Sequence, residues 1–220
     1  MQKELLLFSG GPDSTILLKY FLLKKRNIIV LNCDLQWCTD VKTCAKIQKK
    51  HVKKIIKYMK NKYGNFEFIE AGITLPIPMG KDFQFGTDDQ WSVFLGATLA
   101  RYYKIKKIWH ASFSYGWKNR EIFLMEKPYW LLNMKPYLNW GTLFDSNFKD
   151  LHVSLPKFHF KGTKIDKFKT KKEAWNYLEP ELKKLVRSCQ VDTSIPGSGK
   201  KKFCGKCYKC KTWIYHKFKK

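Results

Sequence analysis

The sequence has no hydrophobic run that could cross a membrane, because none approaches the roughly 18–20 apolar residues that a bilayer-spanning helix needs. A signal-peptide core is also missing, since Glu4 is followed by only four apolar residues. Neither the Walker pattern G-x-x-x-x-G-K-[ST] nor the dinucleotide fingerprint G-x-G-x-x-G is present. We therefore expect a soluble, cytoplasmic protein without membrane partners that uses neither ordinary phosphoryl transfer nor dinucleotide binding.

Acidic residues and arginines are scarce. The 43 basic side chains outnumber the 18 acidic ones, which gives a formal net charge of +25. A balance of this size favours contact with phosphates. However, most of these basic residues are lysines spread along the whole chain, whereas base-reading sites depend on arginine. Two interpretations stay open: lysine that merely solvates the surface, and a surface that binds a polyanion such as a nucleic acid.

The 220 residues are 44% hydrophobic and 16% aromatic, which suits one folded domain with a small appendage. Apolar periodicity predicts an α/β fold with a doubly wound parallel sheet over residues 1–186 and a separate C-terminal unit over residues 187–220. The predicted strands are 3–8, 27–32, 66–69 and 107–113. The predicted helices run from Pro12-Asp13 to a last turn at 24–26, and over about 41–62, 88–103, 118–127 and 171–178.

Four of the seven cysteines have metal-ligand spacing. The motif C-G-x-C-x-x-C contributes Cys204, Cys207 and Cys210. Cys189 lies before this motif, with fourteen residues between it and Cys204. Two-residue spacers let successive thiolates turn toward one tetrahedral ion, and the surrounding lysines lower thiol pKa values. This predicts a structural zinc site, with an iron–sulfur cluster as the alternative. By contrast, Cys33 ends an apolar run and is expected to pack as a small hydrophobic side chain.

The segment Ser9-Gly10-Gly11-Pro12-Asp13-Ser14 separates the first predicted strand from the first helix. In an open parallel sheet this junction lies at the carboxyl ends of the strands, where ligands bind. Paired glycines let the backbone approach a ligand closely, and the helix N-terminus adds partial positive charge. The segment therefore predicts a cradle for phosphate or pyrophosphate.

This string resembles S-G-G-x-D-S, the signature of the PP-loop ATP pyrophosphatases (adenine nucleotide alpha hydrolase-like fold). With Leu185–Cys189 and the final cysteine motif, it resembles the 7-cyano-7-deazaguanine synthase family. The resemblance implies an ATP-dependent carbon–nitrogen ligase of 7-deazaguanine metabolism, which serves queuosine biosynthesis or DNA modification. It implies ATP and Mg²⁺ as well as Zn²⁺. It assigns catalysis to Asp13 and Ser14, and cofactor binding to Ser9, Gly10, Gly11, Asp13, Ser14 and Thr15.

The same resemblance implies 7-carboxy-7-deazaguanine and ammonia as substrates. The product is the nitrile, or the amide if the reaction stops earlier. Substrate contacts are expected from Asp34, which follows the second strand, and from Tyr115, Trp117 and Arg120 in a Gly-aromatic…Arg pattern. Alternatives to substrate contact stay open: Asp34 caps the following turn, and the aromatic residues belong to the core with Arg120 on the surface. Among the histidines, His110 is the one to examine. A homodimer also stays open.

Two rival functions remain at this point. One is a PP-loop enzyme that adenylates a tRNA base, suggested by the charge of +25. The other is a zinc-stabilised nucleic-acid-binding module that has lost its ligase activity. Binding of ATP would distinguish either enzyme from the non-enzymatic module. Stimulation of AMP formation by tRNA would distinguish the tRNA-modifying enzyme from the ligase.

Overall fold

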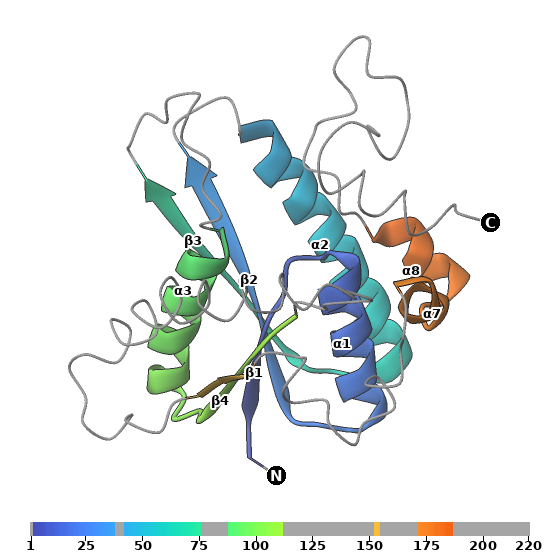
Figure 1. The fold of residues 1–220 in the computed structure, drawn as a ribbon, viewed down its shortest axis with the longest axis horizontal. Coiled ribbons are helices and arrows are strands. Elements are labelled where there is room, and N and C mark those ends of the chain that lie inside the picture. The colour runs from blue at the N-terminus through green and yellow to red at the C-terminus, as the bar shows by residue number, and fades with distance from the viewer. Residues whose placement is uncertain (1, 38–41, 76–87, 112–151, 155–170, 187–220) are drawn as a thin grey trace, which may run out of the picture.

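The computed structural model describes residues 2–37, 42–75, 88–111, 152–154 and 171–186 (Figure 1). The strands are β1 Glu4–Leu7, β2 Ile28–Trp37, β3 Glu67–Leu75, β4 Lys107–His110 and β5 His152–Ser154. The helices are α1 Pro12–Leu23, α2 Lys42–Tyr63, α3 Asp88–Tyr102, α7 Lys171–Asn176 and α8 Pro180–Leu185. Helices and strands alternate from β1 to β4, as the sequence predicts for an α/β protein.

The strands form one sheet in the order β3-β2-β1-β4-β5, and every neighbouring pair is parallel. The first strand of the chain therefore lies at the centre, with Leu6 level with Val30 on one side and Trp109 on the other. Parallel strands must be joined by crossovers, and α1, α2 and α3 supply those between β1 and β2, β2 and β3, and β3 and β4. The expectation of a parallel α/β sheet is confirmed for the described part of the chain.

Both faces of the sheet are buried, and alternate residues of β1 point into different cores. Leu6 and Phe8 pack with α1, α2 and the α7–α8 arm, whereas Leu5 and Leu7 pack with α3. Coverage of both faces explains why β1 and the first half of β2 are continuously apolar instead of alternating, whereas β3 carries an exposed Glu70. Within the described ranges, no helix is both long and apolar enough to span a bilayer.

Several element boundaries differ from the predictions. Strands β2 and β3 continue to residues 37 and 75 because their backbones pair well past the apolar run. Strand β4 ends at His110, and β5 lies in a region that shows no clear periodicity in the sequence. The basic residues 24–26 follow α1 and are not in its last turn. Pro180 begins α8, since a proline at the first helical position loses no hydrogen bond. The predicted helix 118–127 lies outside the described residues.

Candidate functional site

The loop of residues 9–11 joins the carboxyl end of β1 to the start of α1. From β1 the chain moves outward through β2 to β3 on one side, and it returns to the other side as β4. The β1–β4 boundary is therefore the point at which the strand order reverses. Ligands of open α/β sheets bind outside the carboxyl ends of the strands at such a point. The topology thus places the predicted cradle at the expected position for a ligand site.

Gly10 has a φ of +71°, in the left-handed region that side chains disfavour. A Cβ atom built on it would stand 2.7 Å from Cγ2 of Val52, a side chain of α2. The same helix contributes Gln48, whose Nε2 donates to the carbonyl oxygen of Ser9 at 2.8 Å. Glycine is required at position 10 both by the backbone conformation and by the close approach of α2.

Hydroxyl groups organise the turn from inside. The carbonyl oxygen of Gly11 accepts from Thr15 N–H at 3.0 Å, Thr15 Oγ1 at 2.8 Å and Ser14 Oγ at 3.1 Å. The Ser9 hydroxyl lies 3.2 Å from that of Ser14 and accepts from the Gly11 N–H at 3.3 Å. Both Ser14 and Thr15 are buried, whereas Ser9 is exposed. Ser9 Oγ thus occupies a place where an anion oxygen would accept from the backbone.

The N-terminus of α1 begins with groups suited to an anion. Gly11 is the cap residue and has no side chain to fold over the first turn. The first intrahelical hydrogen bond runs from Thr15 N–H to Gly11 O, so the N–H groups of Asp13 and Ser14 precede it. Such groups carry the partial positive charge that binds phosphates at helix N-termini. The half-buried Asp13 adds a carboxylate at the same turn.

A buried amide fixes the end of β1. Asn32 is 3% exposed, and its Nδ2 donates to the carbonyl oxygen of Phe8 at 2.8 Å. The Phe8 N–H in turn donates to Leu31 O at 2.7 Å. Because the loop begins at the next residue, Asn32 positions its first peptide. Sequence reasoning missed this role, although a single polar residue after the apolar run 28–31 was a signal that could have revealed it.

Two further predicted residues lie on strands flanking the loop. His110 is level with Leu7 and ends β4, so it reaches the same edge of the sheet. The backbone of Asp34 continues β2 beyond the apolar run and pairs with Gly72 of β3. Tyr115, Trp117 and Arg120 lie outside the described residues, and so do Cys189, Cys204, Cys207 and Cys210. The described part of the chain thus places the cradle and His110 at the carboxyl edge, while Asp34 is located only by its backbone in the extension of β2.

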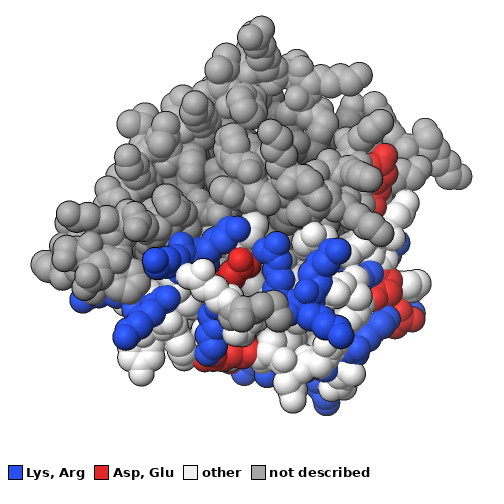
Figure 2. Space-filling view, turned by 90° about the horizontal axis from the view of Figure 1, so that it is seen from below, with Lys and Arg blue, Asp and Glu red and all other residues white. Residues whose placement is uncertain are grey.

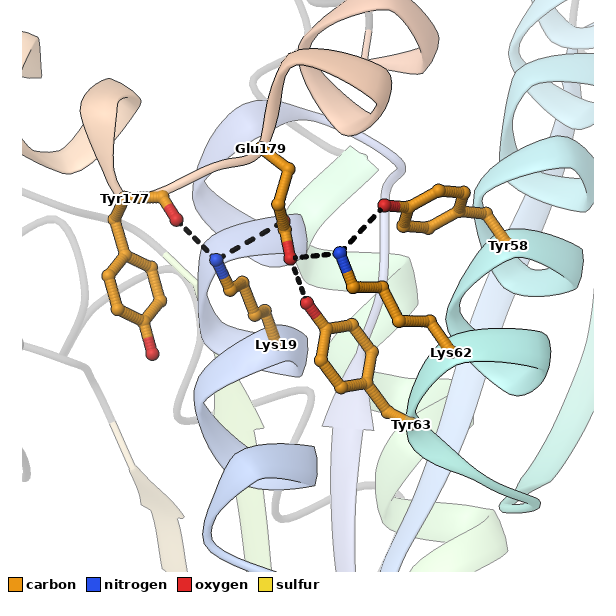
Figure 3. A network of polar contacts seen from close by, with 6 residues as sticks. All are labelled: Lys19, Tyr58, Lys62, Tyr63, Tyr177 and Glu179. Atoms are coloured by element: carbon orange, nitrogen blue, oxygen red, sulfur yellow. Dashed lines mark hydrogen bonds and ion pairs between the residues drawn. The ribbon is translucent and has the colours of Figure 1, made fainter.

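An ionic network joins the α7–α8 arm (the C-terminal arm, residues 171–186) to helices α1 and α2, which build the site (Figure 3). Glu179, between α7 and α8, pairs with Lys19 of α1 at 3.1 Å and with Lys62 of α2 at 3.0 Å. It also accepts from the Tyr63 hydroxyl, and Lys19 donates to the carbonyl oxygen of Tyr177. Lys19 is only 8% exposed, so these partners compensate for its loss of contact with water. One carboxylate therefore holds α1, α2 and the arm together.

The pKa of Glu179 reflects this setting. Burial alone would raise it, but hydrogen bonds from Tyr63, its own backbone, Lys62 and Lys19 outweigh burial and lower the pKa to about 2. A second contact ties the arm to α2, where a ring nitrogen of His51 lies 2.9 Å from Leu185 O. These contacts hold α8 against α2.

Cys33 packs against the core on the α3 side, as expected for a small hydrophobic side chain. Burial raises the pKa of its thiol to about 12, which a weak contact with Ser92 only partly offsets. A thiol that stays protonated is neither a good nucleophile nor a good metal ligand. Among the residues that the structure describes, no group of three or more His, Cys, Asp or Glu could hold a metal ion.

No protein-family model matches the sequence, and a comparison with curated proteins finds no match either.

Proposed function

We propose that this chain is an AMP-forming ligase of the PP-loop class. It adenylates 7-carboxy-7-deazaguanine and condenses it with ammonia, in the manner of the 7-cyano-7-deazaguanine synthase family that its two end motifs resemble. The observation that carries the proposal is the loop of residues 9–11 at the carboxyl end of the central strand. There Gly10 leaves no room for a Cβ beside Val52, and α1 begins directly after the loop, at the carboxyl edge of the sheet.

The proposed reaction begins with the substrate carboxylate, which is a poor electrophile because its leaving group would be oxide. One of its oxygens attacks the α-phosphorus of ATP, and pyrophosphate leaves. Ammonia then attacks the acyl carbon, AMP leaves, and a primary amide forms with loss of a proton. A second ATP activates the amide oxygen in the same way, and loss of AMP and a proton gives the nitrile. An enzyme that stops after the first cycle releases the amide.

The cradle residues act on the leaving pyrophosphate in this proposal. The N–H groups at the start of α1 donate to its oxygens, and the Ser14 hydroxyl turns from Gly11 O to a phosphate oxygen. Preorganised donors of this kind stabilise charge that develops in the transition state. Rotation of Ser9 frees the Gly11 N–H for the same purpose. Asp13 would hold a Mg²⁺ ion through its carboxylate, and the ion would offset the charge that develops on the leaving pyrophosphate.

The test is incubation of the protein with ATP, ammonium and 7-carboxy-7-deazaguanine, followed by mass spectrometry of the product. We expect release of AMP and pyrophosphate that depends on the acid, and a product with the mass of the nitrile or of the amide. Asp13→Ala should abolish AMP formation without unfolding the protein. The control is Glu181→Gln, which removes an exposed carboxylate from the first turn of α8 and should not alter turnover. No AMP in the presence of the acid would refute the proposal.

The zinc site is tested separately. Cys207→Ser should lower the zinc content from about one ion per chain and destabilise the C-terminal unit, because metal binding and folding of such a unit are linked. Cys33→Ser is the matched control, since this thiol lies in the α/β core. Equal zinc content in the wild-type protein and the Cys207 variant would contradict the ligand assignment.

A further inference from the structure

The amino edge of the sheet, opposite the candidate site, gathers positive charge. All strands are parallel, so the connections from α1 to β2 and from α3 to β4 come back to the edge at which β1 also begins. We name the basic residues of these segments the amino-edge patch: Lys3, Lys24, Lys25, Arg26, Lys104, Lys106 and Lys107. Figure 2 looks onto this edge from below and shows many Lys and Arg side chains there, with acidic side chains among them.

Two acidic residues that the structure describes at this edge, Glu4 and Glu67, are already paired. Glu4 accepts from Arg26 at 3.0 Å and from Trp109 Nε1 at 2.9 Å. Glu67 lies 3.4 Å from the Lys3 ammonium. Four exposed lysines of the patch lie in segments that contain no acidic residue: Lys24, Lys25, Lys104 and Lys106. A polyanion bound there would find positive charge that no neighbouring residue of the same segment neutralises.

Two of these lysines hold conformations that usually belong to glycine. Lys25 and Lys104 have φ values of 51° and 54°. Each follows its helix at the position where Schellman motifs place glycine, with Arg26 N–H donating to Phe21 O and Ile105 N–H donating to Ala100 O. Lysine at such a position carries backbone strain that glycine would avoid. Lysine occupies the position usual for glycine at the ends of both α1 and α3. This repetition of a strained residue points to a function for the two charges.

Large apolar side chains are exposed at the same edge. In the described part of the chain, the large hydrophobic residues that are exposed are Leu23 at 51% and Tyr102 at 80%. Leu23 ends α1 and Tyr102 ends α3, so each lies within two residues of a strained lysine. A tyrosine ring presented to solvent among lysines is the arrangement on which nucleic-acid bases stack.

We propose that the amino-edge patch binds a single-stranded segment of RNA. Its lysines contact successive phosphates, and a base stacks on Tyr102. The single arginine of the patch, Arg26, is paired with Glu4. The other basic residues are lysines, which suit phosphate contact rather than base reading, and an aromatic platform suits an unpaired base rather than a duplex. RNA is favoured over DNA because proteins commonly recognise RNA through single-stranded loops and ends. The patch faces away from the carboxyl edge, so it serves to anchor the protein and is independent of the proposed ligase activity.

The test is fluorescence anisotropy of the whole protein with a labelled 20-nucleotide RNA of unstructured sequence, over a range of salt concentrations. Four phosphate contacts predict a slope of log affinity against log salt of about −3, at about 0.7 per contact for single strands. Lys25→Gly with Lys104→Gly should weaken binding about tenfold at 0.1 M salt while raising the melting temperature. Tyr102→Ala should also weaken it about tenfold. The matched control is Lys50→Gln with Lys54→Gln on the exposed side of α2, which should change affinity less than twofold.

Equal losses in the control and in the patch variants would overturn the proposal, since binding would then follow total charge alone. Equal affinity for a duplex DNA of the same length would overturn the assignment to a single strand, and equal affinity for single-stranded DNA would overturn the assignment to RNA. Vesicles of phosphatidylcholine and phosphatidylserine at 3:1 form the last arm. Retention by vesicles without binding of RNA would make the patch a membrane surface instead. Circular dichroism of every variant shows that a loss of affinity is not a loss of fold.

Discussion

The two edges of the sheet solve the same backbone problem with different residues. At the carboxyl edge the left-handed position after β1 is Gly10, whereas at the amino edge the left-handed positions after α1 and α3 are Lys25 and Lys104. The positions differ in the space available for a side chain. Val52 would lie 2.7 Å from a Cβ at residue 10, whereas both lysines are exposed. A positive φ alone therefore does not dictate glycine; a positive φ beside a packed helix does.

The edges also differ in the forces that hold them. Neutral hydrogen bonds fix the carboxyl edge, from Asn32 to Phe8 O, from Gln48 to Ser9 O and among the hydroxyls of the turn. Ion pairs fix the amino edge through Glu4, and the C-terminal arm through Glu179. Charge pairs respond to pH and neutral ones do not, so acid should separate these regions.

The strongest test of the first contrast is Gly10→Ala. The new methyl group must displace Val52 or the loop, and the backbone must tolerate a left-handed alanine, which together cost about 3 kcal/mol of unfolding free energy. We expect AMP formation to be lost as well. Gly64→Ala is the control, because Gly64 has a φ of +97° with no atom within 4 Å of a built Cβ. It should cost only about 1 kcal/mol. Urea denaturation measures both, and equal costs would disprove the role of Val52.

The next effect concerns Glu179. Glu179→Gln leaves the buried Lys19 without its anionic partner and should cost about 3 kcal/mol at neutral pH. Because the pKa of Glu179 is lowered to about 2 in the folded protein, its stabilisation is complete above its ordinary pKa of 4.5. It is lost as the pH falls from there toward 2. The gap between wild type and variant in denaturation midpoints should therefore close in acid. Glu181→Gln, an exposed carboxylate two residues further along, should change stability little at any pH.

A smaller effect is expected for Asn32→Ala. It leaves the buried Phe8 carbonyl without the Asn32 amide and should cost about 2 kcal/mol. Since neither group titrates, this cost should be the same at pH 7 and pH 4, in contrast to that of Glu179. Substrate-dependent AMP formation should fall too, because the loop begins at the next residue. A cost that changes with pH in this range would mean that the carboxyl edge is not held by neutral bonds alone.

The smallest effect has the opposite sign. Lys25→Gly removes the strain of a left-handed lysine and should stabilise the protein by about 0.5–1 kcal/mol, or about 1–3 °C in melting temperature. Lys104→Gly should do the same, and the two should add because they lie on different helices. Calorimetry is the measurement. If either change lowered the melting temperature, these lysines would stabilise the fold, which would contradict the strain that we assign to them.

The sequence predicted most elements because their apolar periods are strong and their ends carry clear signals. Gly64 ends α2 as expected, with a φ of +97°. The ends of β2 and β3 could not be predicted, since residues 33–37 and 71–75 are placed by pairing between the two strands and not by their own hydrophobicity. Pro180 would be expected to stop or kink the predicted helix 171–178, but it begins α8, because proline is tolerated at the start of a helix.

The candidate site divides in the same way. The glycines and hydroxyls of the loop are local and were predicted from six consecutive residues. The side chains that press on the loop come from elsewhere in the chain: Gln48 and Val52 approach from α2, and Asn32 from β2. Glu179 meets Lys19 across 160 residues of sequence, and no spacing rule relates them. Long-range packing contacts of this kind appear only once the fold is known.

The central place of β1 has a consequence for synthesis on the ribosome. Its partner on one side, β2, follows within 30 residues, whereas its partner on the other side, β4, begins at Lys107. At roughly 5–20 residues per second, the second partner emerges about 4–15 s after the first. During that interval a nascent chain with β1, α1, β2 and α2 presents a bare hydrophobic strand edge, which is a natural target for a chaperone.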